Sequence, residues 1–317
     1  MMINSDLHLR RVKDRYFTVV TKGKGNQMRS IDKWAAKVLL LFLCTFCAPV
    51  WAQDAGGEVK KEPVADTSEA DKAGKALLLE LQDKFIEAVG GREVLEKFSN
   101  RKMSSKVKIA DAGLEADLNV FVDSQGHFLE SMVITGYGDF QQGLHGDVAW
   151  SLDPINGPRL LTGKEKDQLI RSGRLQPALW LARDHQSAEK AGEETVNDVP
   201  CTIYDLKTKT GSIHKYWISN EDGLARKVAM TLESPMGKIP VQIWMTDYKA
   251  LDGIMYPYQM KMKQGVQNME VQVMTVEHDG EVDPAVLKLP EPVQKLVDRN
   301  KPKEEETVEE PKKESGR

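Results

Sequence analysis

The sequence predicts an α+β protein in which an antiparallel β half-barrel of about ten or eleven strands curls around helices. Two observations carry this prediction. Polar and apolar residues alternate over most of residues 103–276, and clusters of Gly, Pro, Asn or Asp interrupt the alternation about every 8–12 residues. Two stretches, residues 75–98 and 163–185, have helical spacing instead. Short connections place strands that are neighbours in sequence next to each other in the sheet.

The N-terminal region, residues 1–52, reads as an extension followed by a secretory signal peptide. Residues 38–50 form an apolar run that is too short to span a membrane, and small residues precede a cleavage site between Ala52 and Gln53. We therefore expect the mature chain to be exported to the periplasm. Basic residues precede the apolar run, as in signal peptides: Arg29, Lys33 and Lys37.

The cysteines support a mature chain without lipid anchor or disulfide. Cys44 and Cys47 lie inside the apolar run, and no lipoprotein box surrounds them, so neither lipidation nor redox chemistry is expected from their C-x-x-C spacing. Cys201 is the remaining cysteine and is expected to be a small buried side chain. Met28 begins a leader of ordinary length, so translation starting at Met1 or at Met28 remains open.

The charge distribution argues against nucleic acid as a partner. The chain has a formal net charge of −4, and residues 1–52 contribute nine Lys or Arg and three Asp or Glu, so the remainder carries −10. Nucleic-acid binding needs basic patches.

The composition divides the mature chain into three parts. Residues 53–72 contain Gly, Glu, Ala and Pro without apolar periodicity and are expected to be a flexible linker. Residues 73–290 are expected to form the folded domain. Residues 291–317 are rich in Lys and Glu and are expected to be a disordered charged tail.

The folded domain is expected to begin with two helices. Residues 75–89 carry an apolar stripe of Leu78, Leu81 and Phe85, and the Gly90-Gly91 pair ends this helix. Residues 92–98 form a second, short helix. The period then changes to two, and strands are expected over residues 103–109, 118–122, 128–134, 140–144 and 148–150.

A helical segment interrupts the strands. Residues 153–159 read as a proline-flanked loop, and Thr162 with Glu165 fits a capping box at a helix start. Residues 163–185 are expected to be helical, with breaks near Gly173 and Pro177. Because this segment interrupts the sheet, it is expected to lie over a face or a mouth of the sheet.

A second group of strands follows the helical segment. Asn197-Asp198 is expected to join the first two of these strands. The group is rich in methionine, which is favoured both in irregular cores and on surfaces that accept varied apolar shapes. The expected strands cover residues 188–196, 202–206, 213–219, 224–232, 239–248, 254–263 and 269–275.

No catalytic motif is present, so we predict a protein that is not an enzyme and uses no cofactor or metal. The sequence lacks a nucleophile elbow, an H-E-x-x-H motif and a phosphate-binding glycine loop. Four residues around one hairpin have the types that hold a cation in a hydrolase, but Asp and Gly are also the default turn residues. They are Asp139, His145, Asp147 and Asp153.

Three blocks of the sequence, residues 85–98, 136–165 and 216–258, carry a family resemblance. They resemble exported bacterial domains, mostly uncharacterised, that are related to the outer-membrane lipoprotein-sorting (LolA/LolB-like) proteins, and the resemblance covers residues 75–290. It implies a half-barrel around helices, with an apolar cavity that holds lipid or acyl chains outside the cytoplasm. The carriers latch their helical lid with an arginine, and the sequence shows no clear counterpart. Binding of lipid or another apolar ligand is therefore favoured over direct lipoprotein transport.

The function expected from these observations is non-catalytic binding of an apolar ligand. The partners would be a lipid or an acylated protein, together with envelope proteins, and the chain is expected to be a monomer. An envelope scaffold with a filled interior is the alternative. Eight aromatic and methionine residues are the expected lining of the cavity: Trp150, Trp180, Trp217, Met230, Trp244, Met245, Tyr258 and Met260.

Overall fold

The computed structural model describes residues 67–234 and 237–300. The expected leader, its cleavage site at Ala52 and Gln53, most of the expected linker and residues 301–317 lie outside this part of the chain. Within the described ranges, no helix combines the length and the apolar content needed to cross a membrane.

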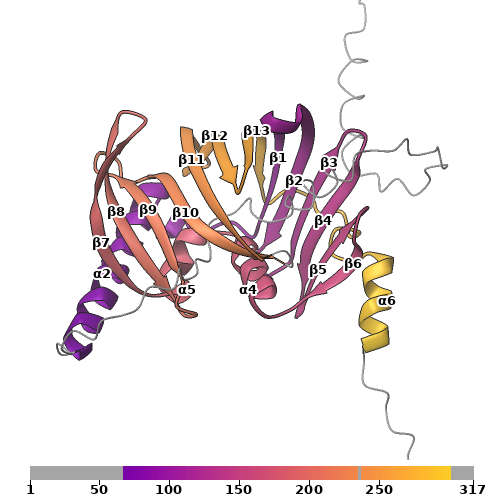
Figure 1. The fold of residues 1–317 in the computed structure, drawn as a ribbon, viewed down its shortest axis with the longest axis horizontal. Helices are drawn as coiled ribbons and strands as arrows, with labels where there is room; N and C mark the ends of the chain where they lie inside the picture. Colours follow the sequence, from indigo (N-terminus) through magenta and orange to yellow (C-terminus); the bar gives the residue numbers. More distant parts are fainter. Residues whose placement is uncertain (1–66, 235–236, 301–317) are drawn as a thin grey trace, which may run out of the picture.

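One antiparallel sheet of 13 strands forms the body of the molecule (Figure 1). Its edges do not pair, so the sheet is an open half-barrel, which confirms the predicted fold class. The strands are Asn100–Ile109 (β1), Leu114–Asp123 (β2), Phe128–Ile134 (β3), Gly138–His145 (β4), Val148–Asp153 (β5), Gly157–Leu161 (β6), His185–Val196 (β7), Val199–Thr208 (β8), Ile213–Ser219 (β9), Ala225–Ser234 (β10), Gly237–Leu251 (β11), Ile254–Gln264 (β12) and Gln267–His278 (β13).

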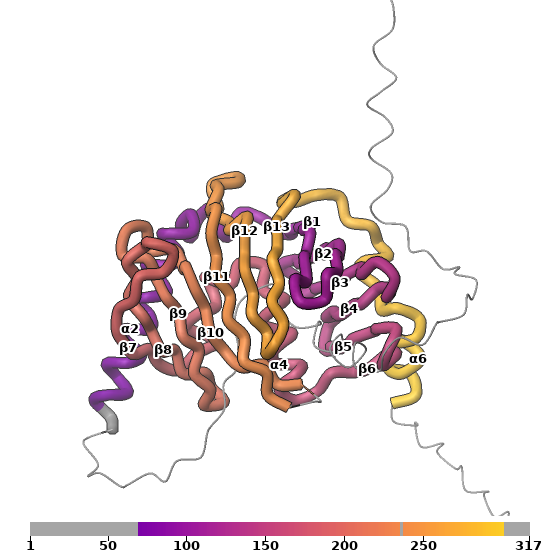
Figure 2. The backbone as a smooth tube through the Cα atoms, turned by 45° about the horizontal axis from the view of Figure 1, so that its top comes forward, coloured from indigo at the N-terminus to yellow at the C-terminus, as the bar shows by residue number. Residues whose placement is uncertain are grey.

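The sheet consists of two meanders that meet in its middle. The spatial order runs from β6 through β1, then from β13 through β7, so the first and last strands are paired neighbours. Figure 2 shows the two groups of strands as parts of one curved surface. The two edge strands, β6 and β7, are consecutive in the sequence, so the chain between them must pass from one edge of the sheet to the other.

That connection is helical, as predicted, and is broken where the sequence indicated. It comprises α4 (Gly163–Ser172), the 3-10 helix η2 (Pro177–Trp180) and α5 (Leu181–Asp184). Buried Leu169 and Leu181 of this connection belong to the same apolar cluster as the inward side chains of the strands. The connection therefore covers the concave face of the sheet.

The N-terminal helix α2 (Thr67–Val89) packs against the same assembly. Leu78 and Leu81 join the main core, and Ile86 joins a smaller cluster with Ile254 of β12. The helix ends at Val89 before the two predicted glycines, and a short helix α3 (Arg92–Leu95) follows. The remaining helical elements are η1 (Ala110–Ala112) and α6 (Glu291–Asn300).

Burial alternates along the strands as the sequence pattern predicted. In β1, the side chains of Arg101, Met103, Ser105, Val107 and Ile109 are buried and those between them are more exposed. Such alternation places one set of side chains on the concave face and the other on the convex face. The predicted turn between β7 and β8 is also present, because both of its residues adopt positive φ, 49° and 64°.

Three details differ from the sequence predictions. The predicted loop after Asp153 contains β6, an edge strand that tolerates Pro158 because one side of its backbone has no partner strand. Thr162 makes no side-chain capping bond, and the side chain of Glu165 pairs with Arg159 at 3.0 Å. Residues 291–300 form α6 within the predicted disordered tail.

The folded part of the chain is longer at both ends than the expected residues 73–290, because α2 begins earlier and α6 follows later. Val293 of α6 is completely buried where the helix packs against β6 and β5, which explains why this charged segment is ordered. Helix α2 begins at Thr67, within the expected linker of residues 53–72. The folded part therefore covers residues 67–300, apart from the two residues between β10 and β11 that the structure leaves undescribed.

The docking of α2 gives a direct test of the fold. Leu78 is 1% exposed and Leu79 is 48% exposed, so identical substitutions at adjacent positions separate burial from helix propensity. We expect Leu78→Ala to lower the free energy of unfolding by about 2–5 kcal/mol. Leu79→Ala is expected to change it by about 0.5 kcal/mol or less. Urea denaturation measures both, and equal losses would contradict this placement of α2.

Candidate functional site

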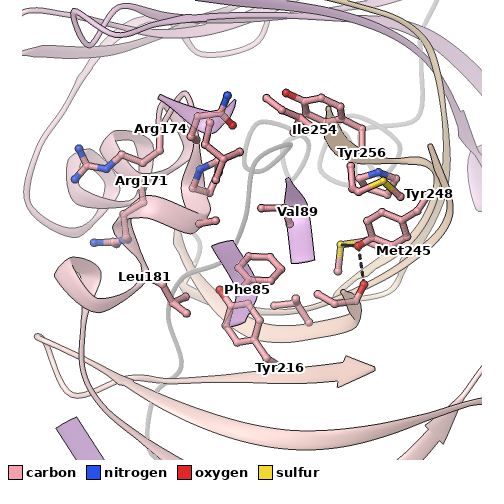
Figure 3. Close-up of a pocket in the computed structure, with 18 of the residues that line it drawn as sticks. Phe85, Val89, Arg171, Arg174, Leu181, Tyr216, Met245, Tyr248, Ile254 and Tyr256 are labelled. Carbon is pink, nitrogen blue, oxygen red and sulfur yellow. Dashed lines mark hydrogen bonds between the residues drawn. The ribbon is translucent and has the colours of Figure 1, made fainter. Parts of the chain in front are cut away.

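A pocket of about 200 Å³ lies between the concave face of the sheet and the helices (Figure 3). Its walls come from α2, from the helical connection and from strands of both meanders. Most of the lining is apolar, and the charged side chains come mainly from the connection. A mostly apolar lining with a few polar groups is the usual composition of small-molecule pockets.

The helical wall of the pocket consists of the end of α2 and the middle of the connection. Phe85 and Val89 are contributed by the last turns of α2, with Val89 close to the centre of the view in Figure 3. Pro177, Ala178 and Leu181 are contributed by η2 and α5. This wall is made of short helices and a helix end, whereas the facing wall is a continuous sheet.

The sheet wall contains tyrosines whose hydroxyl groups are tied to other groups of the protein. The hydroxyl of Tyr248 donates to the carbonyl oxygen of Ala225 at 2.6 Å, and burial raises the pKa of this phenol. The hydroxyl of Tyr256 lies 2.8 Å from Nε2 of His278. With their polar ends held, the rings contribute apolar surface to the pocket.

The charged side of the pocket lies on the connection. Arg171, Arg174 and Asp184 line it, and the two arginines lie on the side opposite Met245 and Tyr248, with their guanidinium groups directed away from the centre of the pocket (Figure 3). Nη2 of Arg174 is 3.4 Å from Oδ1 of Asp184. Burial lowers the pKa of Arg171 to about 10 and also lowers that of Arg174, while burial raises the pKa of Asp184. These groups therefore carry charge in a poorly hydrated place.

The position of these arginines depends on a close approach between the connection and the sheet. A Cβ atom on Gly173 would lie 2.9 Å from Cδ1 of Leu144 and 3.0 Å from Cβ of Phe128, so a larger residue would push α4 away from β3 and β4. Trp180 completes the cluster, because the Cζ atoms of Arg174 and Arg183 lie 3.8 and 4.6 Å from the centre of an indole ring.

Arg101 joins the sheet to the connection. It lies on the inward face of β1, is 3% exposed and donates from Nη1 to the carbonyl oxygen of Leu175 at 3.1 Å. This buried arginine of the sheet therefore contacts the helical connection directly. The sequence pattern that could have identified Arg101 as an inward-facing residue is its alternation with Met103, Ser105 and Val107.

A pair of buried histidines forms a second polar link at the end of α5. Nδ1 of His185 lies 2.8 Å from the carbonyl oxygen of Leu181, and its Nε2 lies 2.8 Å from Nδ1 of His214. Because a carbonyl only accepts, Nδ1 of neutral His185 carries the proton, and its Nε2 accepts from His214. Burial lowers the pKa of His185 to about 4 and that of His214 well below its usual value.

The structure brings two of the eight expected lining residues, Met245 and Met260, to the pocket wall. Trp217 and Trp244 belong to the opposite face of the sheet, where they pack with Cys201, which is buried as expected. Their sequence neighbours Tyr216 and Met245 face the pocket, and successive residues of a strand point to opposite faces.

The other four expected residues also lie away from the lining. Trp150 packs over Gly143 of the neighbouring strand, and Met230 is buried in the main core. Tyr258 packs against the edges of two apolar clusters, and Trp180 covers the arginines. The sequence pattern predicted the strands, but it did not indicate which side chains of each strand point to the concave face of the sheet.

The four residues considered as cation ligands have structural roles instead. Asp139 accepts from Ser131 and Gln141, and Asp153 accepts from the backbone of the turn that follows it. His145 lies with its ring centre 5.3 Å from that of His127, and the carbonyl oxygen of Asp147 accepts from Lys166. Within the described residues, no group of three or more His, Cys, Asp or Glu is placed to hold a metal ion.

The contact of Arg101 with the connection can be tested by hydrogen exchange. Removing a buried hydrogen bond from a charged donor costs about 1.5–3 kcal/mol. We therefore expect Arg101→Met to speed amide exchange in residues 175–184. Arg92→Met, which removes an exposed arginine that pairs with Glu96, is the matched control and should leave this exchange unchanged. Equal exchange in both variants would contradict a holding role for Arg101.

The histidine pair predicts a dependence of stability on pH. Unfolded His185 takes up a proton near pH 6.5, whereas folded His185 remains neutral down to about pH 4. The unfolded chain therefore binds more protons between these values, and the free energy of unfolding should fall by about 3 kcal/mol as the pH drops from 6.5 to 4. His185→Gln should reduce this fall, as measured by urea denaturation across the range. A wild-type stability independent of pH would contradict the burial of a neutral imidazole.

Comparison with known proteins gives a similarity of fold. Neither a protein-family model nor a curated protein matches the sequence. Solved structures with a similar backbone include a DUF1329 family protein from Desulfovibrio piger (11% identity, TM-score 0.48), a putative outer membrane lipoprotein-sorting protein domain from Vibrio parahaemolyticus (10%, 0.47) and a LolA superfamily protein from Nitrosomonas europaea (12%, 0.45). Each comparison covers 67% of this chain and 97% of the other.

Proposed function

We propose that this protein is an exported, non-catalytic, carrier-like protein that binds a lipid or another apolar ligand in the bacterial envelope. The observation that carries the proposal is the largely apolar pocket of about 200 Å³ between the sheet and the helices. Export is supported by the basic residues and the apolar run of residues 38–50, which have the order found in signal peptides.

The energy of binding would come from removing apolar ligand surface from water. Each buried methylene contributes about 0.8 kcal/mol before the cost of ordering the ligand. Pockets that enclose a drug-sized ligand have volumes of about 300–1,000 Å³, so this pocket in its present form is suited to part of one acyl chain. A ligand with several chains would require the helical wall to move.

The helical connection is the part of the wall best suited to such movement. Its segment after α4 is built from short pieces, η2 and α5, rather than from a long helix or a sheet. Polar contacts made by Arg101 and His185 hold this segment against the sheet. Segments of this kind open at lower free-energy cost than paired strands do. Opening of the connection would expose the pocket without disturbing the sheet.

The pocket can be tested by filling it. We expect Val89→Trp to place an indole in the pocket and to weaken binding of the neutral apolar probe N-phenyl-1-naphthylamine at least about tenfold. The matched control is Leu79→Trp, which adds the same side chain to the exposed face of the same helix and should leave binding unchanged. Fluorescence titration gives the affinities. Absence of probe binding by the wild-type protein would refute the proposed function.

Native mass spectrometry of the protein purified from its own envelope provides an independent test. A bound lipid, retained by the wild-type protein and by Leu79→Trp but lost from Val89→Trp, is the expected result. Protein that is free of ligand and does not take up acyl probes would count against a carrier role.

A further inference from the structure

A neutral polar side chain of the pocket, that of Gln176, has an amide group without a partner. Gln176 lies on the helical connection at the start of η2 and is part of the pocket lining. The residue is 5% exposed, and its side-chain nitrogen Nε2 is buried without a hydrogen-bond partner among the described residues. The side chain makes no capping bond to η2 either. Burying an amide donor without a partner is unfavourable, so its presence in the lining calls for an explanation.

Other polar groups of the lining are already partnered or directed elsewhere. The hydroxyl groups of Tyr248 and Tyr256 have partners within the protein. Arg174 pairs with Asp184, and the guanidinium groups of Arg171 and Arg174 are directed away from the centre of the pocket (Figure 3). An anionic head group would therefore not be met by the cations of the connection. A neutral acceptor needs only one donor, which is the group that Gln176 leaves unpaired.

The backbone on both sides of Gln176 is held in place. The carbonyl oxygen of Leu175 accepts from Arg101 at 3.1 Å. Pro177 follows directly, and a proline restricts the backbone of the residue before it. The carbonyl oxygen of Gln176 itself accepts from the backbone nitrogen of Leu179 at 3.1 Å. The side chain therefore starts from a fixed position, which lowers the entropy lost when its amide binds a ligand.

The amide becomes reachable when the connection moves. In the present form Nε2 is closed to water. Gln176 lies between α4 and η2, in the part of the wall that we expect to move when a ligand enters. Val89 lies close to the centre of the pocket and Met245 lies on the opposite wall (Figure 3). A ligand that displaces the connection would thus meet an amide donor on one side and apolar surface on the other.

We propose that the ligand is a neutral acyl ester and that Gln176 determines this preference. The ester carbonyl oxygen would accept a hydrogen bond from Nε2, and the acyl chain would lie against Val89 and Met245. Pairing would remove the cost of the buried free donor, so the protein would gain from the ligand what its own fold does not supply. The proposal rests on the apolar-ligand function and narrows it to a ligand with a neutral carbonyl group.

The test compares ligands that differ in the carbonyl group. The affinities of methyl dodecanoate and dodecyl methyl ether are measured at pH 7.5 by displacement of N-phenyl-1-naphthylamine from the purified protein. Both ligands have the same chain of heavy atoms, and the less polar ether would bind at least as tightly if no hydrogen bond formed. We expect the ester to bind about fivefold more tightly, the effect of one neutral hydrogen bond. Dodecanoate, which has an anionic head group, should bind more weakly than the ester.

A variant of the amide assigns the preference to Gln176. Gln176→Met removes the amide and keeps the length of the side chain, so it should bring the ratio of the ester and ether affinities close to one. Gln259→Met is the matched control, because Gln259 is exposed on β12 beside Met260 of the pocket wall. It should keep the wild-type ratio.

The stability of the ligand-free protein separates a binding role from a structural one. Gln176→Met should raise the midpoint of urea denaturation, because it removes a buried donor that has no partner. A glutamine that holds the fold together would give a lower midpoint on substitution. Gln259→Met should leave the midpoint nearly unchanged. A lower midpoint for Gln176→Met would overturn the proposal, since the amide would then have a partner within the protein.

The binding outcomes separate this inference from the function on which it rests. If the ester and the ether bind with equal affinity, or if dodecanoate binds more tightly than the ester, the neutral carbonyl is refuted while apolar binding stands. If the ester is preferred but the ratio survives in Gln176→Met, the assigned residue is refuted. If no acyl ligand displaces the probe, or the probe does not bind, the apolar-ligand function fails and this inference fails with it.

Discussion

The pairing of the first strand with the last is the constraint on which the rest of the structure depends. β1 and β13 pair along nearly their whole length, with Met103 opposite Val276 and Ile109 opposite Met269. This pairing joins two local meanders into one sheet and leaves β6 and β7 as its edges. Because β6 and β7 are consecutive in sequence, the chain between them must cross the sheet, and it does so on the concave side. The pocket lies beneath that crossing.

The two walls of the pocket consequently differ in how they are stabilised. The sheet wall is held by ladders of backbone hydrogen bonds that extend over 13 strands. The helical wall is held by packing of a few apolar side chains and by polar contacts from Arg101, His185 and Arg174. Stability in proteins is distributed unevenly in this way, and the less stable element is the one that moves when a ligand enters. The strand order thus explains both the rigid sheet wall and the separately held helical connection.

Much of the fold could be predicted from the sequence, because its signals are local. Period-two alternation gave the strands, Gly90-Gly91 gave the end of α2, and Gly173 and Pro177 gave the breaks in the connection. Which face of a strand is concave depends on the curvature of the whole sheet, which no local pattern contains. Trp217 and Trp244 were therefore wrongly predicted to line the pocket and lie on the opposite face of the sheet, whereas Met245 and Met260 do line it.

The charged residues of the site were not predicted, because their placement also depends on tertiary structure. Arg101 stands at an inward position of an alternating strand, a signal that is visible only when the strand is extended back beyond Met103. Arg171 and Arg174 come together through a tertiary approach at Gly173. Helix α6 was missed because its stability comes from the burial of Val293 against β6 and β5, and its own composition is charged.

The positions of the two outermost helices have a consequence for association between molecules. An open sheet has two edge strands whose free backbone groups are able to pair with another chain. Here α2 packs against β7, approaching so closely that a Cβ on Gly74 would lie 3.0 Å from Ser187, and α6 packs against β6. Each end of the folded chain thus shields one margin of the sheet. Addition of a second copy strand to strand, and hence growth into a continuous fibre, is hindered at both margins.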